Sequence, residues 1–309
     1  MSKNIFITGN GAWGQALAIT LTSAGHDVTL WGRSDKPAPN GIKATNDLSL
    51  LRGADYALLV TPAQSTRAVL PQLQPYLRSE TSLILCSKGL ELSTGLRQSE
   101  IAQELLPQQR IGILSGPNFA SEIARGLPAA TVIAAGDLTN AERYAADLAT
   151  PNLRPYASDD VIGVELCGAL KNVLAIGAGL VIGAGLGENA RAALITRGLT
   201  EITRLGLACG AKPATFVGLA GIGDVLLTCS STQSRNFAYG HAVGAEQPID
   251  TSKTVEGLPT IKAALRLAAG HGIDLPITEA LHHLLYDKRS LDTVLQELMA
   301  RPLKSEMER

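Results

Sequence analysis

The chain has 309 residues, 45% of them hydrophobic, so it can bury a sizeable core, and at roughly 150 residues per domain we expect two domains. Its 27 Lys and Arg residues against 28 Asp and Glu leave a formal net charge of −1. This balance excludes bulk electrostatic attraction to nucleic acid or to an anionic membrane surface. An anionic ligand therefore has to be held by local groups.

Three further features predict a cytoplasmic protein. The four cysteines are widely spaced and form no Cys-x-x-Cys or Cys/His cluster, which is typical of reduced thiols. The N-terminus enters a strand-like run directly, without the pattern of an export signal. The longest apolar run, residues 173–187, is glycine-rich and shorter than the about 20 residues that span a bilayer, so we expect a buried core helix there. We expect no membrane insertion, no nucleic-acid partner and no metal.

The first half of the chain alternates short β-branched runs with segments that carry apolar residues at helical spacing. The expected strands cover residues 4–8, 27–31, 56–61, 82–87, 110–115 and 130–135, with a weaker one at 152–156. The expected helices include residues 12–24, 63–77 and 140–149. Such alternation predicts an α/β fold with a doubly wound parallel sheet of the Rossmann type.

Strand signals stop near Asp159, and helical patterns rich in Ala, Leu and Gly continue to the end. We therefore expect an N-terminal domain of residues 1–156 and an all-α C-terminal domain of residues 157–309. The boundary falls in the segment PYASDD, which follows the last strand-like run.

A glycine fingerprint, G-x-G-x-x-G, follows the first expected strand and opens the first expected helix. It consists of Gly9, Gly11 and Gly14. Glycines at this spacing let the backbone approach a pyrophosphate at the helix N-terminus. The pattern alone is weak, and its place between a strand and a helix gives it weight.

The second expected strand ends where an NAD-specific site would carry an acidic residue that binds the ribose. Here the residue is Arg33, followed by Ser34 and Lys36. Basic residues suit the 2′-phosphate of NADP and do not exclude NAD. The alternative is an ordinary solvated arginine after a strand.

Further motifs follow the expected strands and continue into the helical half. In chain order they are SKG (87–89), SGPNFA (115–120), ELCGALKN (165–172), GLAGIGD (218–224), SRN (234–236) and VEG (255–257). The first two lie at the carboxyl ends of strands, where ligands bind in open α/β sheets.

In this order the motifs resemble those of the bacterial NAD(P)-dependent glycerol-3-phosphate dehydrogenases: GxGxWG, SKG, SGPxFA, ELxGALKN, GxAGxGDLxxTC, SRN and VEG. The resemblance covers nearly the whole chain. It implies an NAD(P)-binding Rossmann domain, a helical substrate domain, and interconversion of dihydroxyacetone phosphate and sn-glycerol 3-phosphate with NAD(H) or NADP(H). This reaction would supply glycerol 3-phosphate for phospholipid synthesis.

The resemblance gives catalytic roles to three residues. Lys171 would exchange the proton on the C2 oxygen, Lys88 would polarise the carbonyl and contact substrate and cofactor, and Asp224 would orient Lys171 or accept a substrate hydroxyl. Burial in an apolar helix would lower the pKa of Lys171 toward the range useful for acid-base chemistry. The alternatives are a lysine that reaches the surface and an aspartate that caps a turn.

The resemblance also implies a substrate site. Gly116 allows close approach, Asn118 bonds a hydroxyl, and Ser234, Arg235 and Asn236 clamp the phosphate, with Arg235 offering charge-assisted bonds. In isolation, SRN is more typical of an ordinary helix N-terminus.

The remaining positions match cofactor contacts of the family. Beside the three glycines of the fingerprint they are Ala12, Trp13, Arg33, Ser34, Lys88, Ala120, Arg235, Thr254 and Glu256.

The chain departs from the family in two places. The segment after Arg33 is shorter than the usual connection and lacks a helix that flanks the adenine pocket, and Ala12 replaces a frequent serine. Two other functions stay open: a reductase of ketopantoate or a 3-hydroxy acid with the same two-domain plan, and a non-catalytic NADP-binding sensor. Oligomeric state is also left open, with a homodimer among the options.

Overall fold

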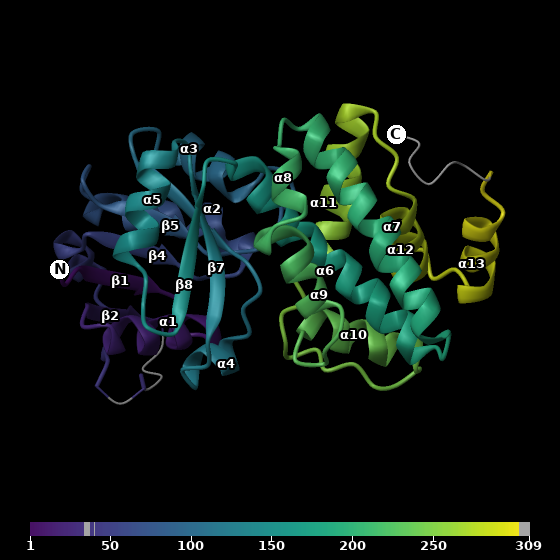
Figure 1. Cartoon of the computed structure of the whole chain (residues 1–309), viewed down its shortest axis with the longest axis horizontal. Coiled ribbons are helices and arrows are strands. Elements are labelled where there is room, and N and C mark those ends of the chain that lie inside the picture. Colours follow the sequence, from purple (N-terminus) through teal and green to yellow (C-terminus); the bar gives the residue numbers. More distant parts are fainter. Residues whose placement is uncertain (34–37, 40, 303–309) are drawn as a thin grey trace.

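An eight-stranded sheet forms the first half of the chain in the computed structural model (Figure 1), which describes residues 1–33, 38–39 and 41–302. The strands lie in the order β3-β2-β1-β4-β5-β6-β7-β8. Their bounds are β1 Asn4–Thr8, β2 Asp27–Trp31, β3 Lys43–Thr45, β4 Tyr56–Leu59, β5 Ser82–Leu85, β6 Arg110–Ser115, β7 Ala129–Ala135 and β8 Leu153–Ser158. The α/β fold expected from the sequence is confirmed.

The sheet is mostly parallel, as expected, and the sequence analysis did not anticipate one antiparallel pair of strands. β6 and β7 are antiparallel, whereas the other neighbouring pairs run parallel. Between them lies only the five-residue helix α4, Ala120–Ala124. A helix of that length spans about 7.5 Å and does not carry the chain back along a six-residue strand of about 20 Å, so β7 turns back beside β6.

A short edge strand, β3, was not anticipated. It pairs with β2 in parallel, and the amide of Gly32 donates to the carbonyl of Thr45 at 3.1 Å. Within the described residues between β2 and β3, no helix occurs. β3 therefore forms the edge of the sheet beside β2.

Alternating side chains bury both faces of the sheet. Ile5 and Ile7 of β1 pack on the face covered by α1 (Ala12–Ser23) and α5 (Leu138–Asp147). Phe6 packs on the opposite face, with α2 (Thr66–Leu73) and α3 (Gln98–Leu105). Short 3-10 turns complete the connections at Leu48–Gly53, Ala63–Ser65 and Gln74–Tyr76.

The second half is helical, as expected (Figure 1). Its elements are α6 Val161–Gly183, α7 Gly187–Ala208, α8 Pro213–Phe216, a π-turn η4 at Leu219–Gly223, α9 Asp224–Thr228, α10 Arg235–Gly244, α11 Gly257–His271, α12 Pro276–Leu285 and α13 Leu291–Met299. The expected buried core helix is α6, which begins earlier than the apolar run suggested. Although α6 is long and apolar enough to cross a membrane, 89% of its most apolar window is buried inside the protein.

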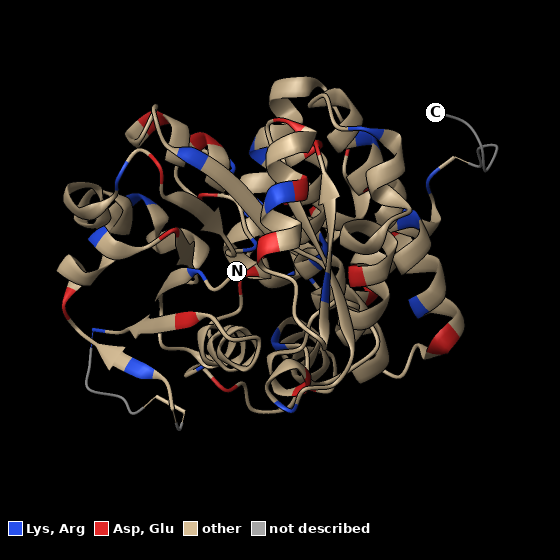
Figure 2. Cartoon of the chain, turned by 60° about the vertical axis from the view of Figure 1, so that its left-hand side comes forward, with Lys and Arg blue, Asp and Glu red and all other residues tan. Residues whose placement is uncertain are grey.

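Charges of both signs are interspersed over the two halves (Figure 2).

Asp160 caps α6 by accepting a hydrogen bond from the amide of Gly163 at 2.9 Å, and it also accepts one from the amide of Lys212 at 2.9 Å. The start of the long helix is therefore fixed to the chain that follows α7.

Helices α6 and α10 cross with their backbones in close approach. A Cβ built on Gly179 of α6 would lie 2.1 Å from the carbonyl oxygen of Phe237, and one on Gly240 of α10 would lie 1.9 Å from that of Ile176. Only glycine allows this separation. The crossing fixes α10, whose first turn carries the SRN motif, against the helix that carries Lys171.

We predict opposite effects of substitutions at two helical glycines. Gly179→Ala should destabilise the fold by about 1–3 kcal/mol or more, because the new methyl group overlaps the α10 backbone. Gly270→Ala in α11 is the matched control, since a Cβ there meets nothing within 4 Å, and it should stabilise by about 0.5–1 kcal/mol. Urea unfolding of both variants measures the difference. Equal stabilities would contradict the close crossing.

Candidate active site

The carboxyl ends of the first six strands line one edge of the sheet. Their order, 3-2-1-4-5-6, reverses direction between β1 and β4, which is where dinucleotides bind in doubly wound sheets. Gly9 follows β1, Arg33 lies just beyond β2, Lys88 lies just beyond β5, and Gly116 follows β6. Parallel strands therefore bring four residues distant in the sequence to one edge.

The glycine turn after β1 fits a pyrophosphate. Gly9 has φ +129°, and a Cβ there would lie 2.6 Å from the carbonyl oxygen of Val60. A Cβ on Gly14 would lie 1.9 Å from the carbonyl oxygen of Gly9. Gly11 is the N-cap of α1 and meets nothing within 4 Å. Two glycines let the turn fold, and the third leaves the approach to the helix N-terminus open, as a dinucleotide requires.

A buried carboxylate joins the two halves of the chain at this edge. Asp224, at the start of α9, is fully buried. It accepts a bond from Lys88 Nζ at 2.7 Å on one oxygen and from Lys171 Nζ on the other. Lys88 also donates to the carbonyl of Gly116 at 2.8 Å, and Lys171 donates to the hydroxyl of Thr228 at 2.8 Å. The three expected catalytic residues thus form one cluster.

The electrostatics of this cluster adjust its proton affinities. Burial lowers the pKa of Lys171 to about 8, opposed by the negative charge of Asp224 and assisted by the nearby Lys88. Burial alone would raise the pKa of Asp224, but the two ammonium groups outweigh it and the pKa is lowered. With the lysines protonated, two positive charges face one negative charge. The cluster therefore has a net positive charge suited to an anion or a developing oxyanion.

A chain of buried amides leads from the Lys88 backbone to the starts of α10 and α11. Asn172 donates to the Lys88 carbonyl at 3.1 Å, and Asn236 donates to the side-chain oxygen of Asn172 at 2.9 Å. The amide of Gly257 then donates to Asn236 at 2.9 Å. This relay fixes the starts of α10 and α11 relative to Lys88 and Lys171. Both functional groups of the Asn236 side chain are engaged within the protein.

The other SRN residues lie at the N-terminus of α10. The hydroxyl of Ser234 caps the helix by accepting from the amide of Phe237 at 3.3 Å, and Ser234 is buried. Arg235 is exposed at the first helical position. The helix-terminus interpretation of SRN thus describes its structure, and it leaves Arg235 accessible as a cation.

Glu256 is the N-cap residue of α11, close enough to Arg235 for their charges to interact. One carboxylate oxygen accepts from the amide of Ala63 at 3.3 Å, and the other is buried with no hydrogen-bond partner among the described residues. Burial raises the pKa of Glu256, against the effects of the Ala63 amide and of Arg235. Thr254, two residues earlier, is exposed.

Two further buried polar atoms that have no hydrogen-bond partner among the described residues lie at this edge of the sheet. They are Ser115 Oγ and Asn118 Oδ1, on the strand and loop that lead into α4. The amide nitrogen of Asn118 donates to the carbonyl of Ala130 at 3.0 Å, which anchors the loop to β7. Since buried polar atoms are nearly always bonded, these acceptors suit a ligand with hydroxyl groups.

The remaining expected positions lie further out. Ala12 opens α1 and is exposed, Trp13 packs in part against the sheet core, and Ala120 opens α4. Arg33 is exposed beyond β2. Ser34 and Lys36 lie outside the described residues.

Comparison with known proteins matches both halves of this arrangement. The N-terminal family profile, described as "NAD-dependent glycerol-3-phosphate dehydrogenase N-terminus", matches residues 4–141, and the corresponding C-terminal profile matches residues 160–296. A glycerol-3-phosphate dehydrogenase [NAD(P)+] of Mesorhizobium japonicum is 46% identical, over 99% of this chain and 94% of the relative. The chain belongs to the NAD-dependent glycerol-3-phosphate dehydrogenase family.

Other relatives agree with this assignment. A glycerol-3-phosphate dehydrogenase [NAD(P)+] of a Chelativorans species is 45% identical over 98% of both chains. The crystal structure of glycerol-3-phosphate dehydrogenase from Coxiella burnetii superposes with a TM-score of 0.89 at 35% identity, covering 97% of this chain and 99% of that one. The alignment with the Mesorhizobium relative spans 324 positions, more than the 309 residues here, so the relative has residues that this chain lacks.

Two residues that contact the cluster of Lys88, Lys171 and Asp224 were not among the expected site residues. Thr228 stands four residues after Asp224 in α9, so the spacing alone places it on the same helix face. Asn172 is adjacent to Lys171 in the sequence, but its partners Lys88 and Asn236 come from elements distant in the chain. Sequence spacing predicts the first neighbour, and no local signal predicts the second.

Proposed function

We propose that this family member interconverts dihydroxyacetone phosphate and sn-glycerol 3-phosphate, using NAD(H) or NADP(H). The observation that carries the proposal is the buried carboxylate of Asp224 shared by Lys88 and Lys171 beside a dinucleotide-type turn. A ketopantoate or hydroxy acid reductase is disfavoured by the family assignment. A cofactor-binding sensor would not need two lysines paired with one buried carboxylate. The direct test follows nicotinamide absorbance with dihydroxyacetone phosphate and, separately, with ketopantoate.

The lysines divide the work in this proposal. In the reducing direction, Lys171 donates its proton to the C2 oxygen while Lys88 polarises the carbonyl from the sheet side. Asp224 and Thr228 hold the Lys171 ammonium in place. When bound, the nicotinamide supplies the hydride to C2 and accepts it in the reverse direction. In the oxidising direction, neutral Lys171 takes the hydroxyl proton.

The substrate phosphate is assigned to the start of α10. Arg235 supplies charge and paired donors there, next to a helix N-terminus that favours anions. Ser234 and Asn236 belong to the same proposed clamp, although their side chains also cap α10 and join the amide relay. In this proposal Gly116 and Asn118 face the rest of the substrate, and the unpartnered side-chain oxygen of Asn118 can accept a hydrogen bond from a substrate hydroxyl.

The cofactor is assigned to the crevice between β1 and β4. The glycine turn holds the pyrophosphate, and Arg33 contacts the ribose end. Further proposed contacts come from Ala12, Trp13, Ser34, Lys88, Ala120, Arg235, Thr254 and Glu256. The partly unpartnered carboxylate of Glu256 supports a bond to a cofactor amide or hydroxyl, because burial without such a bond is costly.

The wider setting is part of the same proposal. Residues 1–156 bind the cofactor and residues 157–309 supply most of the substrate site. The last strand, β8, continues to Ser158, and α6 begins at Val161.

The four free cysteines fit a cytoplasmic enzyme. Its product would feed phospholipid synthesis. A homodimer remains part of the hypothesis, and the mass in solution tests it.

We predict that Lys171→Ala lowers kcat by about 100-fold or more, because the proton on the C2 oxygen loses its donor. The exposed Lys212, which pairs with Asp159, provides a matched control, and Lys212→Ala should leave kcat nearly unchanged. Near-normal turnover in Lys171→Ala would contradict the assignment.

The pH profile gives an independent measure of the same group. Because the reducing direction needs protonated Lys171, its rate should fall as pH rises through about 8, the value to which burial lowers the pKa. The oxidising direction needs the neutral amine, so its rate should rise over the same range. Steady-state kinetics in both directions give the two limbs. Parallel profiles would exclude Lys171 as the group that transfers the proton.

We predict that Arg235→Ala raises the KM for dihydroxyacetone phosphate by about 10-fold or more, through loss of charge-assisted phosphate bonds. The KM for the cofactor should change less. Arg110 begins β6 at the opposite edge of the sheet, so Arg110→Ala is the control. If phosphorylated and unphosphorylated triols are turned over equally well, the phosphate clamp is wrong.

The last prediction concerns cofactor choice. Both cofactors should be used, with NADPH favoured by kcat/KM, because Arg33 stands where an acidic ribose ligand would be. Arg33→Ala should reduce the NADPH to NADH ratio by about 2- to 5-fold, the range of a solvent-screened charge contact. An unchanged ratio would mean that the 2′-phosphate is recognised elsewhere.

A further inference from the structure

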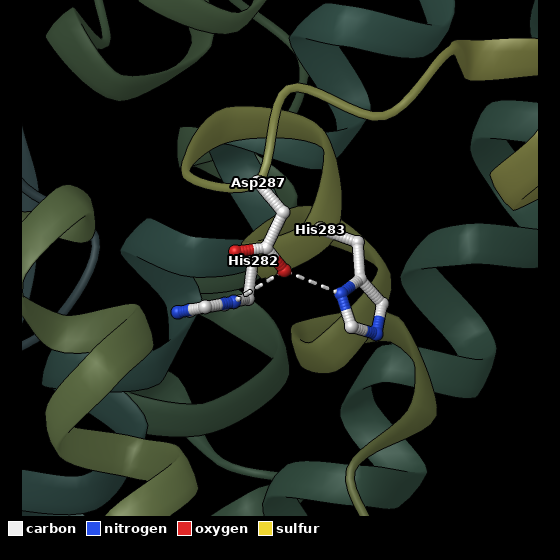
Figure 3. Close-up of side chains that lie close together, drawn as sticks. All are labelled: His282, His283 and Asp287. Atoms are coloured by element: carbon white, nitrogen blue, oxygen red, sulfur yellow. Dashed lines mark hydrogen bonds and ion pairs between the residues drawn. The ribbon is translucent and has the colours of Figure 1, made fainter.

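Two histidines and an aspartate converge at the carboxyl end of α12 (Figure 3). His282 and His283 belong to the last turn of the helix, and Asp287 follows it. Nδ1 of His283 lies 2.7 Å from Asp287 Oδ2, and Nδ1 of His282 lies 3.5 Å from the same oxygen. All three potential ligand atoms lie within 4.8 Å of one another.

The donor set and spacing fit a transition metal ion. Two imidazole nitrogens and a carboxylate are ligands typical of open zinc sites, in which water completes the coordination. At metal-ligand bonds of 2.0–2.1 Å, tetrahedral donors are separated by about 3.3 Å. The two measured separations bracket that value. The side chains are 27%, 32% and 46% exposed, so an ion and its water can enter.

Neighbouring groups hold the first histidine in position. The His282 ring stacks on Tyr286, with centroids 5.1 Å apart and planes 29° from parallel. The Tyr286 hydroxyl donates to the carbonyl of Leu258 in α11 at 2.8 Å. This stacking restrains the orientation of the His282 ring. Of the nearby cations, Lys262 lies over the Tyr286 ring and Arg289 pairs with Glu297.

An ion pair at the helix end explains only part of this arrangement. His283 and Asp287 are four residues apart, a spacing that favours a local pair, and a protonated histidine is favoured at a helix C-terminus. That pair does not account for His282 directing the equivalent nitrogen at the same oxygen. Two protonated imidazoles there would repel each other, whereas a bound cation uses both lone pairs.

We propose that His282, His283 and Asp287 bind one divalent first-row transition ion, such as Zn²⁺ or Cu²⁺, with water as the remaining ligand. Each histidine coordinates through Nδ1 and carries its proton on Nε2, and Asp287 coordinates as the carboxylate. The site lies outside the cluster of Lys88, Lys171 and Asp224, and it takes no part in hydride transfer. It connects α12 to the segment that leads into α13.

The experiment titrates Zn²⁺ into the chelator-treated full chain without a polyhistidine tag, by calorimetry. We expect one Zn²⁺ per chain and no binding of Mg²⁺, which prefers oxygen ligands. His283→Gln and Asp287→Asn should each weaken Zn²⁺ binding by more than about 100-fold, since even loss of an outer partner costs 10- to 100-fold. Zn²⁺ should raise the Tm of the wild type and leave those of the two variants unchanged.

Controls make the proposal falsifiable. His271 lies near Cys209, with Nε2 3.5 Å from Sγ, and His271→Gln should bind Zn²⁺ as the wild type does. Electron paramagnetic resonance with Cu²⁺ should show two nitrogen ligands in the wild type and one in His282→Gln. Circular dichroism without metal checks that the variants are folded. Absence of Zn²⁺ binding, binding that survives Asp287→Asn, or binding that depends on His271 would each overturn the site.

Discussion

One fully buried carboxylate connects the two halves of this protein. Lys88 lies just beyond β5, whereas Lys171 belongs to α6 and Asp224 to α9, so the bond between Lys88 and Asp224 crosses the interface between sheet and helices. Removing one partner of a buried ion pair typically costs about 3–5 kcal/mol, because the other charge is left without compensation. Burial makes the loss of a partner costly for the Asp224 carboxylate, and burial also lowers the pKa of Lys171. The packing of the two halves and the proposed acid-base chemistry therefore depend on one interaction.

The amide relay extends this constraint to the ligand-facing helices. Asn172 connects the Lys88 backbone to Asn236, and Asn236 connects to the amide of Gly257. Arg235 and Glu256 flank these two positions in the sequence. A shift of either helix would break a buried hydrogen bond, so the exposed cation and the buried carboxylate stay at fixed positions relative to the lysines. The close glycine contacts between α6 and α10 also hold α10 in place, because they leave no space for one helix to slide along the other.

Much of the sheet could be predicted from the sequence, because its strands are continuous β-branched runs bounded by glycine or polar residues. β1, β2 and β6 have the expected bounds. β3 was missed because KAT is short and has no apolar alternation, and its pairing with β2 depends on a tertiary contact. The antiparallel direction of β7 was missed because strand patterns carry no direction; it follows from the shortness of α4.

The site was predictable to the extent that its residues belong to local motifs. Lys88, Lys171 and Asp224 each stand in a recognisable motif, and the structure brings them into contact. The internal bonds of Asn236 could not be anticipated, since Asn172 and Gly257 reach it from other helices. Its side chain is satisfied within the protein, whereas Ser115 Oγ, Asn118 Oδ1 and one oxygen of Glu256 have no bond in the described chain. Buried acceptors of this kind favour a ligand that carries several hydroxyl or amide donors. A triose phosphate and a nicotinamide dinucleotide together offer such donors, and a purely structural role for this crevice would leave the acceptors unexplained.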